Sequence, residues 1–166
     1  MKKIISAGLL ALIGIGAAGF VSLKNRDSVQ PIAYNHFKHV EENAMECLDC
    51  HQYAEKNARA SIPNIEVCRD CHDVAISETE KESTLLSYIT ENQKIPWRQI
   101  YVVPDHAYFS HRRHVKLGEL ECTVCHGEVG KLTAPVAEQY VEVKMDWCLD
   151  CHETRGVTTD CAACHR

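Results

Sequence analysis

All ten cysteines of this chain fall into five copies of one short motif, Cys-x-x-Cys-His, which leaves none for a disulfide. Two thiols three residues apart can each form a thioether to one edge of a single porphyrin, and the imidazole that follows can bind the iron. One copy alone would leave a zinc knuckle or a redox dithiol open. Five copies that all end in histidine instead predict five covalently attached haem c groups. In chain order, sites 1 to 5 are Cys47-Cys50-His51, Cys68-Cys71-His72, Cys122-Cys125-His126, Cys148-Cys151-His152 and Cys161-Cys164-His165.

The histidine count matches the number of motifs. Five of the ten histidines lie inside the motifs, and five irons need five further axial ligands. The sum predicts that every iron is bis-histidine, six-coordinate and low-spin. Met145 is the rival distal ligand, because methionine is the other common choice and raises the reduction potential. Met45 is a weaker rival, since it lies two residues before Cys47. The expected distal ligands are His36, His39, His106, His111 and His114.

Residues 104–126 hold three of these extra histidines but only one attachment motif. One haem needs one distal ligand, so two of the three must serve haems attached elsewhere. This stretch is therefore expected to be the centre around which the fold is organised.

Chain length limits how these haems can be packed. Without residues 1–24, the 166-residue chain leaves roughly 28 residues for each haem, too few for an ordinary apolar core around each. We expect the haems to touch one another and to form most of the interior. The fold class is then a multihaem cytochrome with short helices and little regular secondary structure.

Charge excludes one class of partner. The formal net charge is −5, and nucleic-acid binding would call for a basic face. Ionised haem propionates would add further negative charge, which favours docking to a positively charged protein surface.

The N-terminus carries a membrane signal. Lys2 and Lys3 precede an uncharged, mostly apolar run over residues 4–23, long enough to cross a bilayer as a helix. A cleaved signal peptide usually has a shorter apolar region and a clear small-residue site, so an uncleaved signal-anchor is favoured over cleavage. The expected organisation is a transmembrane helix at 1–24, a tether at 25–33 and a pentahaem domain at 34–166.

Two connecting segments have a pattern of their own. Residues 78–93 read as an amphipathic helix, with Leu85, Leu86 and Ile89 on one stripe and Pro96 beyond its end. We expect this helix to serve packing or partner contact rather than chemistry. The β-branched residues at 140–143 suggest a short strand or hairpin, and the aromatic segment 95–106 is expected over a haem edge or in the core.

The pairs of histidines upstream of sites 1 and 3 resemble those of the class III cytochromes, the cytochrome c3 and c7 group. In that family the first histidine of a Phe-x-His-x-x-His-like pair binds the haem that follows, and the second reaches another haem. The resemblance implies that His36 serves site 1 and His111 serves site 3. His39, His106 and His114 would serve sites 2, 4 and 5 in an order that the sequence leaves open.

A second resemblance covers most of the chain. The N-terminal apolar run, Ile95-Pro-Trp97, residues 104–115, Cys122 to Gly127 and Met145 to His152 look like the pentahaem subunit of alternative complex III. The multihaem subunit of the menaquinone reductase complex looks similar. The resemblance implies an electron-transfer subunit anchored in the cytoplasmic membrane, with its haems on the periplasmic side. It also implies integral membrane quinone-binding subunits and an iron–sulfur/molybdopterin-like subunit as partners, and a periplasmic electron carrier.

Other functions are weaker interpretations. A pentahaem nitrite reductase would need an open haem and a Cys-x-x-Cys-Lys site, which the sequence lacks. A stand-alone anchored quinol dehydrogenase shares the anchor and the haem count, and a soluble carrier would follow from cleavage of the leader. With bis-histidine iron and no substrate site of its own, the chain is expected to transfer electrons within a larger oxidoreductase.

Overall fold

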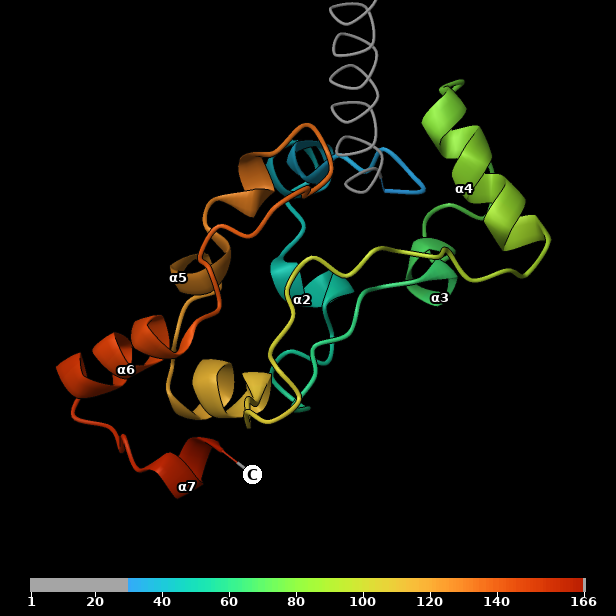
Figure 1. Cartoon of the computed structure of the whole chain (residues 1–166). Coiled ribbons are helices and arrows are strands. Elements are labelled where there is room, and N and C mark those ends of the chain that lie inside the picture. Colours follow the sequence, from blue (N-terminus) through green and yellow to red (C-terminus); the bar gives the residue numbers. More distant parts are fainter. Residues whose placement is uncertain (1–29, 166) are drawn as a thin grey trace, which may run out of the picture.

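The computed structural model describes residues 30–165, which form short helices joined by long irregular segments (Figure 1). Nothing in the described part pairs as a regular strand, and its one β-bridge joins Ala107 to His165. This is the low content of regular structure expected of a multihaem cytochrome. The α-helices are α2 (Cys47–Cys50), α3 (Ile65–Cys68), α4 (Glu80–Thr90), α5 (Thr123–His126), α6 (Met145–Thr154) and α7 (Cys161–Cys164), with π-helical η1 (Lys38–Glu42) and η2 (Arg112–Leu117) and 3-10 turn η3 (Val129–Lys131).

Each attachment motif forms a helical turn, and that of site 4 lies within the longer helix α6. In site 1 the His51 amide donates to the Cys47 carbonyl at 2.8 Å, and the equivalent bond spans Cys161 and His165 at 2.8 Å in site 5. An i→i+4 bond closes one turn of α-helix, which brings both cysteines and the histidine to one side. The motif thus sets its own local geometry, and the remaining fold has to place a second histidine opposite it.

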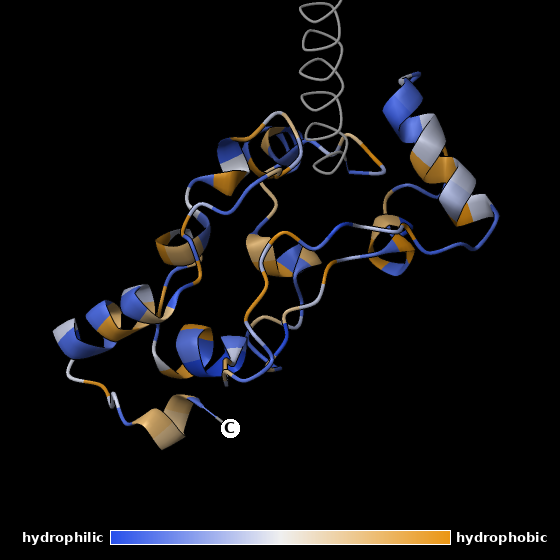
Figure 2. Ribbon diagram, viewed as in Figure 1, coloured by the Kyte–Doolittle hydropathy of each residue, from blue (hydrophilic) through white to orange (hydrophobic). Residues whose placement is uncertain are grey.

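The apolar core is small and lies at one end of the molecule. Among residues 30–165 the buried hydrophobic side chains are Ile32, Ile65, Ile89 and Ile95, with Cys68, Leu85, Tyr88 and Trp97 packed against them. Figure 2 shows the remaining apolar residues scattered along the chain. So few buried side chains cannot account for a stable fold of this size, which fits an interior that bound cofactors complete.

Helix α4 confirms the amphipathic helix expected over residues 78–93, with shorter ends. Thr79 caps its N-terminus by accepting from the Glu82 amide, and it ends before Asn92, whose φ of +54° leaves the helical region. Its inward face differs from the expected stripe: Glu82 and Ile89 are the buried residues, and Leu86 is not part of the core cluster. A carboxylate therefore occupies the first position of an otherwise apolar face.

The short strand suggested at 140–143 was wrong. This segment is an irregular, mostly exposed connector between η3 and α6. Its backbone bonds to side chains instead: the Tyr140 amide donates to the Tyr101 hydroxyl at 2.6 Å and the Val143 amide to Gln139 Oε1 at 3.3 Å. β-Branched residues favour strands only when a partner strand is available to pair with them.

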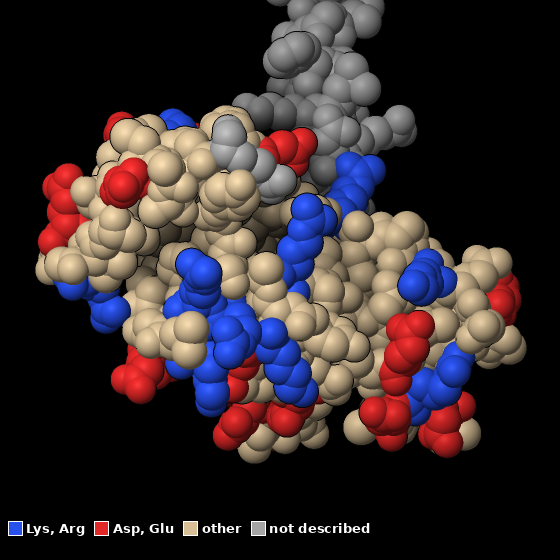
Figure 3. Space-filling view, turned by 90° about the horizontal axis from the view of Figure 1, so that it is seen from below, with Lys and Arg blue, Asp and Glu red and all other residues tan. Residues whose placement is uncertain are grey.

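No helix within residues 30–165 is both long enough and apolar enough to cross a bilayer. The membrane helix expected at 1–24 and most of the tether at 25–33 lie outside the described residues. On the face seen in Figure 3, Lys and Arg gather near the middle with Asp and Glu around them, so the net charge of −5 is unevenly distributed.

Candidate haem-attachment sites

Four of the five attachment histidines face a histidine from outside the motifs. The ring centroids are separated by 6.3 Å for His39 and His72, 6.5 Å for His111 and His126, 6.2 Å for His114 and His152, and 5.5 Å for His106 and His165. These pairs bring together residues far apart in the sequence.

The spacing of these rings is what two axial ligands require. An imidazole nitrogen binds a metal at about 2.0–2.1 Å, so two imidazoles on opposite sides of one iron have centroids roughly 6 Å apart. The residues present therefore fit haem c as a group held by two thioethers and two imidazoles. Bis-histidine coordination needs no third protein ligand, and within residues 30–165 no three His, Cys, Asp or Glu side chains converge as a zinc site would require.

Site 1 has its own neighbour in His36. Burial, followed by the nearby imidazoles of His51 and His39, lowers the pKa of His36 to about 4. The Nδ1 atom of His36 is buried without a hydrogen-bond partner. With His36 beside His51, every attachment histidine has a non-motif histidine close to it, and Met145, at 58 % exposure, is not needed to complete a pair.

The two histidine pairs are built in the same way. Tyr34 lies edge-on to His36 at 4.7 Å and stacks on His39 at 4.6 Å; Phe109 lies edge-on to His111 at 4.9 Å and stacks on His114 at 4.6 Å. A π-helical turn follows each aromatic residue. Tyr34 therefore occupies in the first pair the position that Phe109 occupies in the second.

This similarity defines two structural repeats, 34–72 and 109–152. In each repeat the first histidine lies by the attachment site that follows, and the second lies by the next one. Site 5, with His106 and His165, stands outside the repeats. His39, His114 and His106 lie beside the histidines of sites 2, 4 and 5, respectively, an order that the sequence left open.

Burial keeps several of these imidazoles neutral. It lowers the pKa of His126, with His111 and His51 adding to the effect, and it is also the main cause of the lowered pKa of His111. Neutral imidazole is the form that binds a metal. The electrostatics therefore favour ligation over protonation.

Neighbouring thiols show how the sites follow one another in space. In each case burial is the largest cause of a raised thiol pKa, and a cysteine of the next site adds to it. The neighbours are Cys50 and Cys68 for sites 1 and 2, Cys47 and Cys122 for sites 1 and 3, Cys125 and Cys151 for sites 3 and 4, and Cys148 and Cys164 for sites 4 and 5. The spatial order is therefore 2–1–3–4–5, and the helices α3, α2, α5, α6 and α7 follow it in Figure 1.

The aromatic segment 95–106 reaches both the core and a site. Ile95 is buried, and Trp97 donates through Nε1 to the Pro63 carbonyl at 2.9 Å. Farther along, the Tyr101 ring lies 4.6 Å from that of His126, and its hydroxyl donates to the Cys125 carbonyl at 3.2 Å. The expected core position is therefore confirmed for Ile95 and Trp97, whereas Tyr101 lies beside the histidine of site 3.

One of these histidines differs from the others in the group that its Nδ1 atom contacts. His39, His111, His114 and His152 each face a backbone carbonyl, of Asn35, Ala58, Ser110 and Thr158, at 2.8–3.2 Å. His72 instead faces the carboxylate of Glu82 at 3.1 Å. Sequence reasoning assigned α4 to packing or partner contact and missed Glu82, because a glutamate ten residues after a motif has no distinguishing pattern.

The sequence of this chain is similar to those of known cytochromes. Residues 107–166 match the family described as cytochrome c7 and related cytochrome c. Over 96 % of its length, the chain is 28 % identical to the menaquinone reductase multihaem cytochrome c subunit of Nitratidesulfovibrio vulgaris, of which it covers 87 %. Covalently bound haem c follows from both likenesses and from the Cys-x-x-Cys-His turns. The chain is a multihaem cytochrome c related to the multihaem subunit of a menaquinone reductase.

Proposed function

We propose that this chain is a membrane-anchored pentahaem cytochrome that relays electrons between a quinone-handling membrane complex and a periplasmic redox partner. Bound haem c supplies one-electron transfer between iron(III) and iron(II). The chain's own residues attach, ligate and space the five groups, and the levers that they control are ligand type, burial and nearby hydrogen bonds.

The pairing of ten histidines carries this proposal. Each attachment imidazole has a second imidazole beside it, so each iron would have both axial positions filled and none open to a substrate. The proposed axial pairs are His51 with His36, His72 with His39, His126 with His111, His152 with His114 and His165 with His106. The thioethers are those of the ten motif cysteines.

The spatial order 2–1–3–4–5 makes the relay linear. Sites 2 and 5 are its ends: α3 carries site 2 beside the small apolar core, and α7 carries site 5 near the C-terminus. The Tyr108 amide fastens the site 5 end by donating to the Cys164 carbonyl at 2.7 Å. Electrons entering at one end would leave from the other.

Anchoring and partners complete the proposal. The apolar run before Lys24 supports a signal-anchor at 1–24, a tether at 25–33 and a haem domain at 34–166 on the periplasmic side, where haem is attached to such motifs. The relative's name, which places it in menaquinone reductase, supports membrane partners that handle quinone. The resemblance to the pentahaem subunit of alternative complex III adds an iron–sulfur/molybdopterin-like subunit to the proposed partners.

Spectroscopy and intact mass together test the haem assignment. The chain should be produced with the c-type maturation machinery, and its intact mass should exceed that of the polypeptide by five haems. We expect a low-spin ferric spectrum and no spectral change when carbon monoxide is added to the reduced protein. Stoichiometric carbon monoxide binding at any centre, or fewer than five haems, would contradict the proposed ligation.

Purification tests the assignment to a complex. After solubilisation in mild detergent, we expect large integral membrane subunits to remain bound to the tagged chain. A stand-alone quinol dehydrogenase would instead purify alone and oxidise a menaquinol analogue by itself. A product that lacks the N-terminal residues by mass and stays soluble without detergent would rule out the anchor.

A further inference from the structure

Sites 2 and 4 occupy equivalent positions in the two repeats, yet their attachment histidines have different partners. His39 and His72 have centroids 6.3 Å apart with their planes tilted by 50°, and the corresponding values for His114 and His152 are 6.2 Å and 43°. The Nδ1 atom of His152 faces the Thr158 carbonyl at 2.8 Å, whereas that of His72 faces the Glu82 carboxylate. The two sites are therefore a matched pair that differ in one hydrogen bond.

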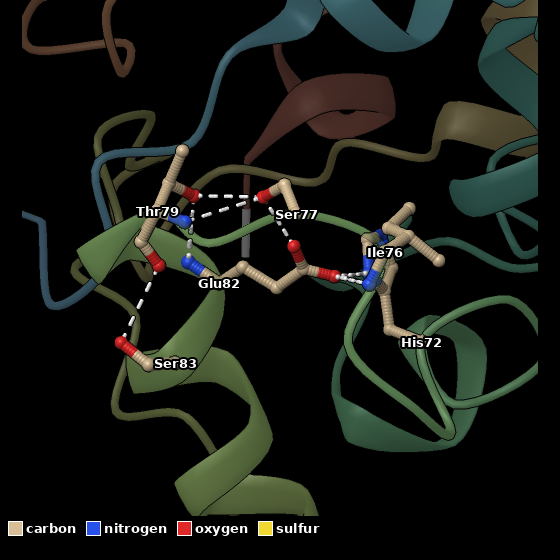
Figure 4. A network of polar contacts seen from close by, with 6 residues as sticks. All are labelled: His72, Ile76, Ser77, Thr79, Glu82 and Ser83. Carbon is tan, nitrogen blue, oxygen red and sulfur yellow. Dashed lines mark hydrogen bonds and ion pairs between the residues drawn. The ribbon is translucent and has the colours of Figure 1, made fainter.

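Glu82 is buried and firmly held. Its side chain is 6 % exposed, and one oxygen accepts from the Ile76 amide at 2.8 Å as well as from His72 at 3.1 Å. The other oxygen accepts from the Ser77 hydroxyl. Figure 4 shows the carboxylate enclosed between these groups and aimed at His72. Both oxygens thus accept hydrogen bonds and neither faces an acceptor, an arrangement that suits an ionised carboxylate.

The position of this carboxylate depends on the fold around α4. Arg69, just after α3, donates to the Ile89 carbonyl and to Asn92 Oδ1, both at 3.2 Å. The Asn64 side chain at the start of α3 accepts from the Ile95 amide at 2.9 Å. These bonds tie both ends of α3 to the segment around α4, so that Glu82 comes to lie beside the histidine of site 2.

We propose that Glu82 tunes site 2, giving it a lower reduction potential than its counterpart, site 4. The inference rests on the proposed function, since it takes His72 as an axial ligand. A carboxylate that accepts the Nδ1 proton makes an imidazole a more basic ligand, and a more basic ligand stabilises iron(III) over iron(II). A backbone carbonyl carries no net charge and does this more weakly. Glu82 is a positioning residue that acts through His72.

Reduction of a haem at site 2 would be a one-electron step. Site 2 gains one electron from the reductant, iron(III) becomes iron(II), and no covalent bond is made or broken. The negative charge of Glu82 opposes this loss of positive charge in a partly dehydrated setting, where it is weakly screened. At one end of the relay, site 2 would therefore remain oxidised at potentials at which site 4 is already reduced.

Glu82→Gln tests the proposal by redox titration of the holoprotein followed by visible spectroscopy. Glutamine preserves the size and an acceptor oxygen but removes the charge. We expect the equilibrium constant for reduction of one of the five haems to increase about tenfold. For a one-electron couple this is a rise of about 59 mV in its reduction potential. An unchanged titration with all five haems in place would overturn the proposal.

Two further variants identify the component and exclude a bulk charge effect. Glu80→Gln removes the same charge from the exposed side of the same helix, and we expect no comparable shift. His39→Met replaces the proposed distal ligand at site 2 and should raise the same component that Glu82→Gln raises. An equal shift from Glu80→Gln, or shifts in two different components, would contradict the inference.

Ser77→Ala gives a test of opposite sign. Loss of the Ser77 hydrogen bond leaves the Glu82 carboxylate a stronger acceptor for His72, so the component should move to lower potential. General loosening of the fold would not move the two variants in opposite directions. Should Glu82→Gln fail to retain haem, a downward shift in Ser77→Ala supports the proposal and no shift overturns it. A high-spin haem signal from the unmodified protein would instead reject the proposed function.

Discussion

The two repeats hold their haem ligands alike but are stabilised differently. Around the first repeat, four isoleucines form a buried cluster, with Ile32 before the repeat, Ile65 within it, and Ile89 and Ile95 after it. Helix α4 adds a carboxylate behind one of the ligands. In described residues 107–165 no hydrophobic side chain is buried. The same ligand geometry therefore does not require the same protein core.

The difference shows which part of the fold is stabilised by contacts within the polypeptide itself. Around α3 and α4, apolar side chains pack on one another and their backbone groups bond to Asn64 and Arg69. The described residues of the second repeat contain no such buried cluster, so its helices would depend on contacts with the cofactors. We expect the second repeat to lose its structure first when cofactors are missing.

Removing an attachment site should have the largest effect. In Cys148→Ala/Cys151→Ala, one haem should be lost, and amide exchange across 107–165 should approach the rate of an unfolded chain, because no apolar core remains there. In Cys68→Ala/Cys71→Ala, by comparison, α4 should keep measurable protection. Hydrogen exchange with mass spectrometry checks both variants, and complete loss of protection in α4 would remove the distinction between the repeats.

Truncating the isoleucine cluster should have the next largest effect. Ile65 is 3 % exposed, and Ile65→Ala should lower the free energy of opening around α4 by about 2–5 kcal/mol. Exchange in the second repeat should change little. The matched control is Ile76→Ala, at a position that is 67 % exposed, which should cost no more than about 0.5 kcal/mol. Equal effects on both repeats would mean that they unfold as one unit.

Two glycines of the second half offer a smaller, matched comparison. Gly127, directly after His126, has φ +63° and ψ −161°, a region that is essentially restricted to glycine, and an added Cβ would lie 2.7 Å from the Tyr140 ring. Gly156 has φ +65° with nothing within 4 Å of the added atom. Gly127→Ala should cost about 1–3 kcal/mol in backbone strain alone. Thermal unfolding of the holoproteins should show a smaller fall in melting temperature for Gly156→Ala than for Gly127→Ala. The reverse order would contradict a role for Gly127 in positioning site 3.

The smallest effect is expected at an ion pair between the repeats. Lys116 in η2 lies 3.4 Å from Glu55, with side-chain exposures of 59 % and 33 %. An exposed pair of this kind contributes roughly 0.2–1 kcal/mol, and less at high salt. A double-mutant cycle with Lys116→Ala and Glu55→Ala measures it. A coupling well above about 1 kcal/mol would contradict this ranking and make the ion pair a major contact between the repeats.

Local features were the ones that the sequence predicted well. Cys-x-x-Cys-His forms a helical turn wherever it occurs in this chain, and α4 follows from its own periodicity and its Thr79 cap. The strand suggested at 140–143 failed because a strand needs a partner, which no local pattern provides. Leu86 was placed on the buried stripe for a similar reason: helical periodicity predicts a face but not which residues on it meet a core.

By itself, the sequence determined the chemistry: how many haems can be attached, that histidines suffice to fill their axial positions, and that so short a chain must rely on cofactors for its interior. The tertiary structure alone decided which of His39, His106 and His114 faces which site, the spatial order 2–1–3–4–5, and the placement of Glu82 behind His72. These are contacts between residues distant in the chain. Their partners are chosen by how the segments pack in three dimensions, and spacing along the sequence carries no information about that choice.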